Sequence, residues 1–197
     1  ALESSTKLQN SIYFKELNDE AVYVNLFVPS TLDWSNRNVT IRQITSFPNE
    51  DHTRLIINGE GIFALKIRVP TWATNGIEVR INGKKETVDA VPGSYLTLSR
   101  SWLDGDEVDI TMPFAFHLEP VMDQQNIASL FYGPVLLAAQ ETEARKDWRR
   151  ITLNAEDPGD GISGDKNTLV FEIDGITFKP FYETYGHHSV YLDVRLK

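Results

Sequence analysis

Apolar and polar residues alternate along most of this chain, and the alternation predicts β-strands. The clearest run covers residues 61–69, where Phe63, Leu65 and Ile67 alternate with Ala64 and Lys66. Successive side chains of a strand point to opposite faces, so such a run has one apolar face and one polar face. Further strands are predicted at residues 11–14, 22–28, 39–44, 53–57, 77–81, 95–98, 108–112, 115–121, 169–173, 176–181 and 190–196. Residues 128–132 and 135–139 are apolar on both faces, which predicts central strands of a second sheet. The pattern predicts an all-β fold in which two antiparallel β-sandwich domains lie in tandem.

Turn residues divide the runs. Asn58-Gly59, Asn82-Gly83 and Asp174-Gly175 each lie between two runs, and such pairs favour β-hairpins because both residues tolerate a positive φ. Pro29 cannot donate to a strand ladder, so it is expected to end the strand that begins at Val22.

The same pattern predicts the domain organisation. Residues 1–10, with one or two helical turns between Leu2 and Leu8, are expected to be the tail of a preceding segment. Residues 11–121 form the first predicted sandwich and residues 122–197 the second, with a break at Met122-Asp123-Gln124-Gln125. Within the second, the charged residues 140–150 favour a short helix, and residues 157–167 are expected to be a mobile acidic loop because they are rich in Asp and Gly.

Composition restricts the partners. The 197 residues include 19 Lys and Arg against 28 Asp and Glu, which gives a formal net charge of -9. A surface of this sign repels phosphate groups, so neither nucleic acid nor an anionic membrane is an expected partner. The chain has no cysteine, which excludes disulfides, thiolate zinc sites and a cysteine nucleophile within it. No apolar stretch approaches the length of a membrane helix.

Three aspartates and two histidines are the candidates for metal binding. Asp157, Asp160 and Asp165 lie in a Gly-rich segment that could hold calcium, although the spacing does not match an EF-hand and a solvated acidic turn is the simpler interpretation. His187 and His188 are adjacent, so on a strand they would face opposite ways and could not share a metal. His52 and His117 are isolated in the sequence. We therefore expect no metal site in this chain.

No catalytic residue is expected either. The nucleophile-elbow, phosphate-loop and dinucleotide-binding motifs are absent from the sequence. A glycosidase needs a pair of carboxylates at a defined separation, and sequence alone cannot rank the many carboxylates present. Asp106 is expected to accept hydrogen bonds from turn N–H groups.

Aromatic residues are the candidates for carbohydrate binding, because flat rings can stack against the C–H faces of sugars. The aromatic residues considered are Trp34, Trp72, Trp102, Trp148, Tyr95 and Tyr132. Of these, Trp72, Tyr95 and Trp102 are the predicted carbohydrate-binding residues. The alternative for Trp72 and Trp102 is that they cap the core, because both lie at predicted strand ends beside Pro70 and Gly105.

A set of short motifs in a fixed order resembles a known family. The motifs are Tyr23-Val24-Asn25-Leu26-Phe27-Val28-Pro29-Ser30, Arg68-Val69-Pro70-Thr71-Trp72-Ala73, Val79-Arg80-Ile81-Asn82-Gly83, Gly93-Ser94-Tyr95, Trp102-Leu103-Asp104-Gly105-Asp106 and Tyr132-Gly133-Pro134. Over residues 11–139 this set resembles the C-terminal β-sandwich region of bacterial β-L-arabinofuranosidases of glycoside hydrolase family 127 and close relatives. Phe178 to Phe181 and His187 to Tyr191 resemble, more loosely, the extra C-terminal region of Bacteroides-type members.

The resemblance implies a division of labour. In the family, an N-terminal (α/α)₆ barrel is expected to carry a cysteine nucleophile, a zinc ion held by further cysteines and a glutamate, and a carboxylate acid/base. Glu3 to Lys7 followed by Ile12-Tyr13-Phe14 resembles the segment that follows the cysteine motif. The resemblance therefore implies that residues 1–10 are the tail of an absent helical catalytic barrel, and that the zinc and the catalytic groups belong to that barrel. The implied partner of this chain is that barrel, with a glycan as a further partner. A periplasmic or secreted location is expected ahead of a cytoplasmic one.

Three functional hypotheses follow. The first is a non-catalytic region that braces the barrel of an enzyme acting on L-arabinofuranose-containing plant glycans, shapes its substrate entrance or forms a subunit contact, and is inactive alone. The second is a freestanding carbohydrate-binding module that uses Trp72, Tyr95 or Trp102. The third is a scaffold or adhesion domain without a glycan ligand.

Overall fold

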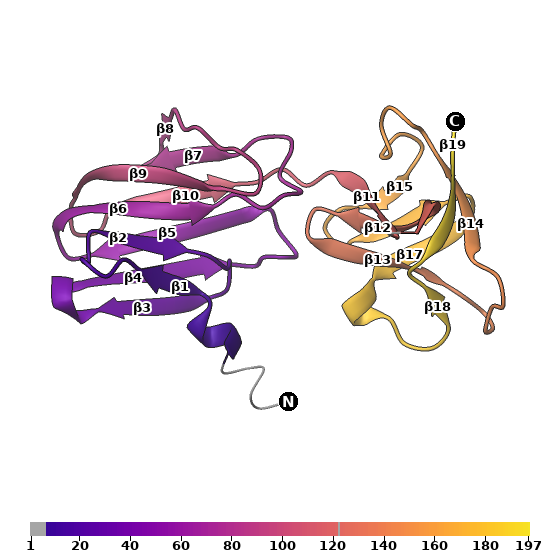
Figure 1. The fold of residues 1–197 in the computed structure, drawn as a ribbon, viewed down its shortest axis with the longest axis horizontal. Coiled ribbons are helices and arrows are strands. Elements are labelled where there is room, and N and C mark those ends of the chain that lie inside the picture. Colours follow the sequence, from indigo (N-terminus) through magenta and orange to yellow (C-terminus); the bar gives the residue numbers. More distant parts are fainter. Residues whose placement is uncertain (1–6, 122) are drawn as a thin grey trace. The chain divides into compact units, whose positions relative to one another are not determined.

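The computed structural model describes residues 7–121 and 123–197, and its elements are almost all β-strands. The chain divides into two compact units, residues 1–113 (unit 1) and residues 114–197 (unit 2), coloured indigo to pink and pink to yellow in Figure 1. The all-β class is confirmed. Residues 7–10 are helical, whereas residues 1–6 of the predicted helical turns lie outside the described residues. Among the described residues, no helix is long and apolar enough to cross a membrane.

Unit 1 consists of two sheets. The four-stranded sheet has the order β1-β2-β6-β9 and the six-stranded sheet the order β3-β4-β5-β10-β7-β8. The strands are β1 (Tyr13–Lys15), β2 (Ala21–Val24), β3 (Ser30–Trp34), β4 (Val39–Thr45), β5 (His52–Asn58), β6 (Gly61–Arg68), β7 (Glu78–Ile81), β8 (Lys84–Glu86), β9 (Tyr95–Trp102) and β10 (Glu107–Thr111). All neighbours are antiparallel except β2 and β6, which are parallel. A 3₁₀ turn, η1 (Ser35–Arg37), connects β3 to β4.

The core of unit 1 comes from the inward positions of both sheets. On β6 the alternate residues Phe63, Leu65 and Ile67 are buried, as the sequence pattern predicts, and they pack in one apolar cluster with residues of β5 and β10. Burial of this apolar area is the main force that holds the two sheets together.

The three Gly-containing turns do not all make hairpins. Asn82-Gly83 joins β7 to β8, and Asp174-Gly175 joins two antiparallel strands of unit 2, as predicted. Asn58-Gly59-Glu60 instead joins β5 of the six-stranded sheet to β6 of the four-stranded sheet, so the hairpin prediction is wrong there. Gly59 has a φ of 101°, and the Gly59 N–H donates to Asp104 Oδ1 (2.8 Å).

Unit 2 is built from nine strands that are connected through β13 and surround one core. The strands are β11 (Phe116–Val121), β12 (Gln124–Tyr132), β13 (Val135–Gln140), β14 (Arg149–Leu153), β15 (Ser163–Asp165), β16 (Val170–Ile173), β17 (Ile176–Pro180), β18 (His188–Ser189) and β19 (Leu192–Leu196). A 3₁₀ turn, η2 (Phe181–Glu183), follows β17. β13 pairs with β12 at its start and with β17 and β18 further along, so one continuous sheet folds over the core. β14 and β19 are the parallel pair of this unit.

Several sequence-based boundaries change. The units divide after Pro113 and not after residue 121, because β11 pairs with β12 and Phe114, Phe116 and Leu118 pack against the core of unit 2. Residues 140–150 form no helix, and β14 begins at Arg149. The predicted loop 157–167 contains β15, which pairs with β16. Strand β3 follows Pro29, where the sequence predicts only the end of a strand.

Candidate functional site

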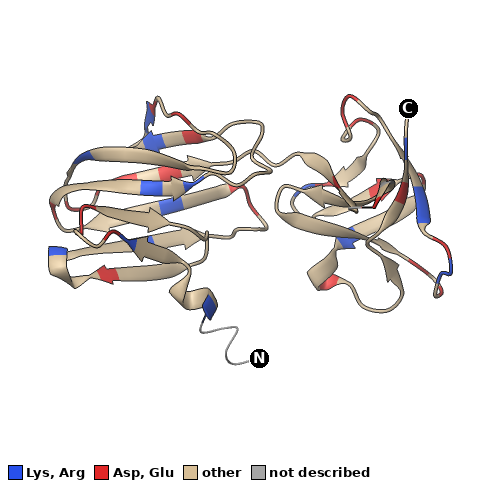
Figure 2. Cartoon of the chain, viewed as in Figure 1, with Lys and Arg blue, Asp and Glu red and all other residues tan. Residues whose placement is uncertain are grey.

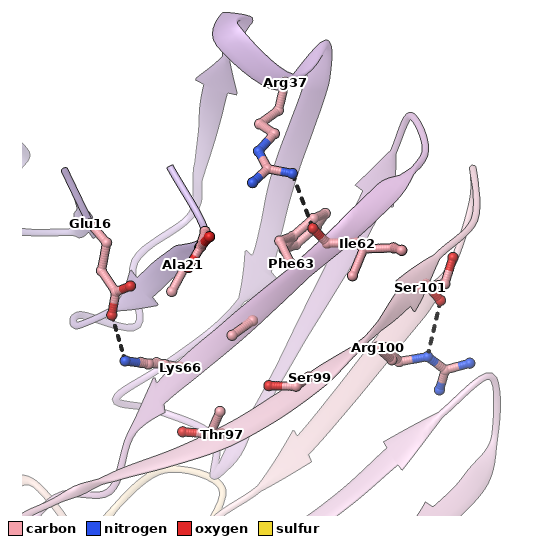
Figure 3. Close-up of a pocket in the computed structure, with 12 residues that line it drawn as sticks. Glu16, Ala21, Arg37, Ile62, Phe63, Lys66, Thr97, Ser99, Arg100 and Ser101 are labelled. Carbon is pink, nitrogen blue, oxygen red and sulfur yellow. Dashed lines mark hydrogen bonds and ion pairs between the residues drawn. The ribbon is translucent and has the colours of Figure 1, made fainter. Parts of the chain in front are cut away.

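The outer face of the four-stranded sheet of unit 1 carries a hollow of about 600 Å³, which we call the sheet-face hollow (Figure 3). It exists because three small residues, Ala21, Ala64 and Ser99, lie side by side across β2, β6 and β9. Longer side chains surround this row. The hollow is lined by Glu16, Glu20, Ala21, Arg37, Ile62, Phe63, Ala64, Lys66, Thr97, Ser99, Arg100 and Ser101.

A hydrogen-bonded group of three side chains lies at one end of the hollow. Lys66 Nζ contacts Glu16 Oε1 (2.6 Å) and the Tyr23 hydroxyl (2.9 Å), and that hydroxyl donates to Glu16 Oε1 (3.1 Å). The Lys66 ammonium also lies 4.7 Å from the centre of the Tyr23 ring. The hydrogen bond from Lys66, together with that from Tyr23, lowers the pKa of Glu16, and the same contact with Glu16 raises the pKa of Lys66. Both groups are therefore charged near neutral pH.

The other end of the hollow is cationic and apolar. Arg37 donates to the backbone oxygens of Asp19 (2.8 Å) and Ile62 (3.0 Å), which fixes its guanidinium beside β6. Arg100 lies over the Trp102 ring, 5.3 Å from its centre. The Ile62 side chain is 75% exposed, so this end also presents an apolar contact.

The carboxylate of Glu16 is a poor candidate for a proton donor, because its pKa is lowered. A general acid at neutral pH needs a carboxyl whose pKa is raised. Among the described residues, every carboxyl with a resolved shift has a lowered pKa: Glu16, Asp19, Glu78, Asp106, Glu141, Asp165 and Asp193. For Asp106, burial raises the pKa, but hydrogen bonds from Asn82 and from the Leu103 N–H outweigh it.

Trp102, a predicted carbohydrate-binding residue, lies in the core of unit 1. It is 0% exposed, its Nε1 donates to the Phe63 carbonyl (3.1 Å), and its ring stacks on Phe63 with centroids 5.8 Å apart. No ring face is open to a sugar, so Trp102 is corrected to a core residue. The alternative reading of this tryptophan as a core cap fits the structure.

Trp72 and Tyr95 lie near each other, at the end of the sheet opposite to Trp102. The Tyr95 hydroxyl donates to Asn25 Oδ1 (2.6 Å), and Asn25 and Trp72 line the same small cavity of about 150 Å³. Trp72 stacks on Phe47, and the exposed Tyr95 ring meets Tyr23 edge to face. The carbohydrate-binding role of Trp72 and Tyr95 stays a prediction.

Two of the other aromatic candidates are also core residues. Trp34 is fully buried, and its Nε1 donates to Asp19 Oδ1 (2.9 Å). Tyr132 is buried among the rings of Phe114, Phe116 and Phe171.

The predicted acidic and histidine candidates are engaged locally. Asp157 accepts from the Gly159 N–H, Asp160 from Asn154 and Asp165 from the Asn167 N–H, so each carboxylate stabilises its own turn. Within residues 7–121 and 123–197 there is no group of three His, Cys, Asp or Glu side chains that could hold a metal.

The four histidines lie in separate environments. His188 Nδ1 lies 2.9 Å from the Gly186 oxygen, His52 Nε2 lies 3.1 Å from Asp109, and His117 stacks on Phe131. His187 contributes its backbone oxygen to a bond from the Glu141 N–H.

Sequence reasoning did not find the residues of the sheet-face hollow. Tyr23, Lys66 and Thr97 are all outward positions of alternating runs, and they form one row only because β2, β6 and β9 are paired in this register. The sequence feature that could have indicated the hollow is the set of small residues at outward positions of β9, namely Thr97, Ser99 and Ser101. Figure 2 shows acidic and basic residues interspersed on the strands of both units, which agrees with the absence of a basic cluster in the sequence.

The comparisons with known proteins fit this architecture. Residues 21–114 match the family model described as "Beta-L-arabinofuranosidase, GH127 middle domain". No curated protein matches the sequence. Three solved structures share the fold over nearly the whole chain. A GH127 β-L-arabinofuranosidase from Geobacillus stearothermophilus T6 is 22% identical, with a TM-score of 0.73 over 95% of this chain.

A protein described as a glycoside hydrolase is 20% identical, with a TM-score of 0.74 over 98% of the chain. The GH127 β-arabinofuranosidase BT3674 is 21% identical, with a TM-score of 0.68 over 89%. The matched region makes up 35%, 38% and 35% of those three proteins, so the chain spans little more than a third of their length. Residues 21–114 thus match the GH127 middle-domain model, and nearly the whole chain shares its fold with part of GH127 β-L-arabinofuranosidases, the family that its motifs resemble.

Proposed function

We propose that this chain is the non-catalytic β-sandwich portion of a glycoside hydrolase that acts on L-arabinofuranose-containing plant glycans, and that it braces the catalytic barrel. One observation carries the proposal. The chain shares its fold with about a third of a β-L-arabinofuranosidase. The remaining two thirds of such an enzyme would then supply the catalytic groups.

The absence of cysteine supports the assignment of the catalytic groups to a part of the enzyme outside this chain. The family resemblance implies a cysteine nucleophile and a zinc ion held by cysteines, and a chain without cysteine can supply neither. The zinc in this proposal therefore belongs to the barrel, and no residue of this chain is assigned to it.

The surface that we propose for the contact is the sheet-face hollow with its exposed apolar rim. Ile62 from β6 and Phe14 from β1 are both exposed, and Leu17 lies fully exposed in the turn after β1. Exposed apolar side chains beside a charged network are typical of interfaces in which an apolar contact is surrounded by polar ones. Arg37 and the Glu16–Lys66 pair would provide the polar contacts.

The test expresses the chain and the catalytic part of the same reading frame as two separate polypeptides. We expect the two to co-purify, and Ile62→Asp to weaken the association while the chain keeps its fold. Val91→Asp is the matched control, because Val91 is an exposed apolar residue of unit 1 outside the hollow. The proposal fails if the reading frame encodes no catalytic part, or if the two polypeptides elute separately.

The freestanding carbohydrate-binding module is the alternative function. Of its three predicted residues, Trp102 is buried, and the Tyr95 hydroxyl is engaged with Asn25. No observation at these three positions favours the module over the bracing role.

A further inference from the structure

Unit 2 presents two exposed aromatic side chains on the outer face of its parallel strand pair. Trp148 immediately precedes β14 and Tyr191 immediately precedes β19, and the first residues of these strands, Arg149 and Leu192, are paired in register. Trp148 is 53% exposed and Tyr191 48% exposed. Their ring centroids lie 6.0 Å apart with an interplanar angle of 80°. The two rings form an apolar corner open to solvent.

A set of charged side chains continues the same face. Since alternate residues of a strand share a face, Arg150 follows Trp148 and Asp193 follows Tyr191. Asp193 Oδ2 accepts from Arg150 Nε (2.9 Å) and Arg195 Nη2 (3.4 Å), and Asp193 Oδ1 accepts from Asn126 Nδ2 (3.2 Å).

The hydrogen bonds to Asp193 hold Arg150 and Arg195 in place and occupy only some of their N–H donors. Asp193 is 9% exposed, whereas the Arg150 and Arg195 side chains are well exposed. A guanidinium has five N–H groups, and the bonds to Asp193 occupy one from each arginine. Asp193 therefore anchors two exposed guanidinium groups on the face that carries the aromatic corner, and each keeps further N–H groups beyond the one bonded to Asp193. Preorganised donors of this kind lower the entropic cost of binding a ligand.

We propose that this surface, Trp148, Arg150, Tyr191, Asp193 and Arg195 (the Trp148 strip), binds a neutral glycan chain. A sugar ring offers an apolar C–H face for the aromatic corner and hydroxyls that accept hydrogen bonds from the guanidinium groups. Asp193 offsets the charge of one of the two arginines, and the chain as a whole has a formal net charge of -9, so the strip is suited to a neutral polyhydroxyl ligand better than to a polyanion.

The inference is independent of the bracing role, because it concerns unit 2 and needs no catalytic barrel. Residues of the strip have no part in the sheet-face hollow. The strip would let the protein bind a polymeric glycan whether or not that glycan is hydrolysed.

The test is affinity gel electrophoresis of the 197-residue chain through gels that contain soluble arabinan, arabinogalactan or xylan. We expect at least one of these glycans to retard the chain. In that gel, Trp148→Ala and Tyr191→Ala should each weaken binding by about tenfold or more, the scale of an aromatic hot spot. Tyr185→Ala is the matched control, because Tyr185 is 90% exposed in the same unit and lies outside the strip.

Circular dichroism of each variant shows whether it is folded. An Arg150→Lys variant keeps the charge and loses the planar donor fork, so it should also weaken binding. The proposal is overturned if none of the three glycans retards the chain, or if Trp148→Ala binds as well as the unmodified chain. It is also overturned if the only consequence of Trp148→Ala is the loss of self-association in sedimentation velocity, since the strip would then be a protein contact.

Discussion

Two tryptophans of unit 1 and the tryptophan of unit 2 lie in opposite environments. In unit 1, Trp34 and Trp102 are fully buried, and each satisfies its indole N–H inside the protein, on Asp19 and on the Phe63 carbonyl. In unit 2, Trp148 is exposed and pairs with an exposed tyrosine. The family-specific motif around Trp102 is therefore explained by folding, whereas the surface suited to recognition lies in the unit with the weaker sequence signal.

The units also differ in how they treat charge. In unit 1 the Glu16–Lys66 pair lies on the sheet face, with both side chains partly exposed. In unit 2 the Glu141 side chain is only 2% exposed and is held by two bonds from Arg149 and one from Ser189 (2.9 Å). A buried carboxylate is costly to leave without its partner, so unit 2 should depend on its ion pair much more than unit 1.

The largest expected effect comes from Trp102→Ala. Removing a fully buried tryptophan leaves a cavity and removes the indole hydrogen bond to the Phe63 carbonyl, so the free energy of unfolding of unit 1 should fall by about 3–5 kcal/mol. Trp148→Ala should change the stability of unit 2 by no more than about 0.5 kcal/mol, as expected for an exposed position. Urea unfolding followed by circular dichroism measures both. Equal losses in the two variants would show that the contrast between the tryptophans is wrong.

The second effect concerns Glu141→Gln in unit 2. The substitution keeps the shape but leaves Arg149 without its anion, so unit 2 should lose about 2 kcal/mol at pH 7. Hydrogen bonding to Arg149, followed by that to Ser189, lowers the pKa of Glu141 in the folded state. Its stabilising contribution is therefore present above the unfolded pKa of about 4.3 and is lost as the pH falls through the folded value.

Unfolding at pH 7 and at pH 3 separates this effect from simple packing loss. The difference between the unmodified chain and Glu141→Gln should be large at pH 7 and should shrink in acid. A difference that is the same at both pH values would contradict the charge argument.

The third effect distinguishes two glycines of unit 1. In Gly59→Ala the new Cβ would meet the Asn38 carbonyl oxygen at a φ of 101°, so we expect a loss of about 2–3 kcal/mol. Gly83, at a φ of 77°, has open space around its Cβ position, so Gly83→Ala should cost about 1 kcal/mol from backbone strain alone. Thermal unfolding of the two variants ranks them. A larger loss of stability in Gly83→Ala than in Gly59→Ala would contradict the close approach of Gly59 to the Asn38 carbonyl oxygen.

The smallest effect is expected at the sheet-face hollow. Lys66→Met removes the partner of Glu16, but the pair is partly exposed, so the loss of stability at pH 7 should be smaller than that of Glu141→Gln. Added salt should reduce it further, because exposed pairs are screened. A loss that exceeds the one at Glu141 would reverse the comparison of the two units.

Alternation predicted the strands because burial on one face imposes a period of two. The run from Gly61 to Arg68 and the hairpin turns at Asn82-Gly83 and Asp174-Gly175 follow from local chemistry alone. Partner choice is not local. Asn58-Gly59 looks like a hairpin turn, but β5 and β6 pair with different neighbours, which no dipeptide encodes.

The missed strands have the same explanation. β14 begins in a charged segment and is held by parallel pairing with β19, far along the chain, while β15 is three exposed residues stabilised by β16. An exposed Trp102 could stack against a sugar ring, and only the structure shows that unit 1 buries it completely. The Trp148 strip was hidden because Tyr191 and Asp193 become neighbours of Trp148 and Arg150 only through the β14–β19 register.

The central proposal is that this chain is the non-catalytic part of an arabinofuranosidase-type enzyme. The most direct measurement is the release of arabinose from an aryl β-L-arabinofuranoside by the purified 197-residue chain. We predict no release above the buffer background. Turnover that disappears in a folded carboxylate variant of this chain, such as Glu16→Gln, would contradict the claim.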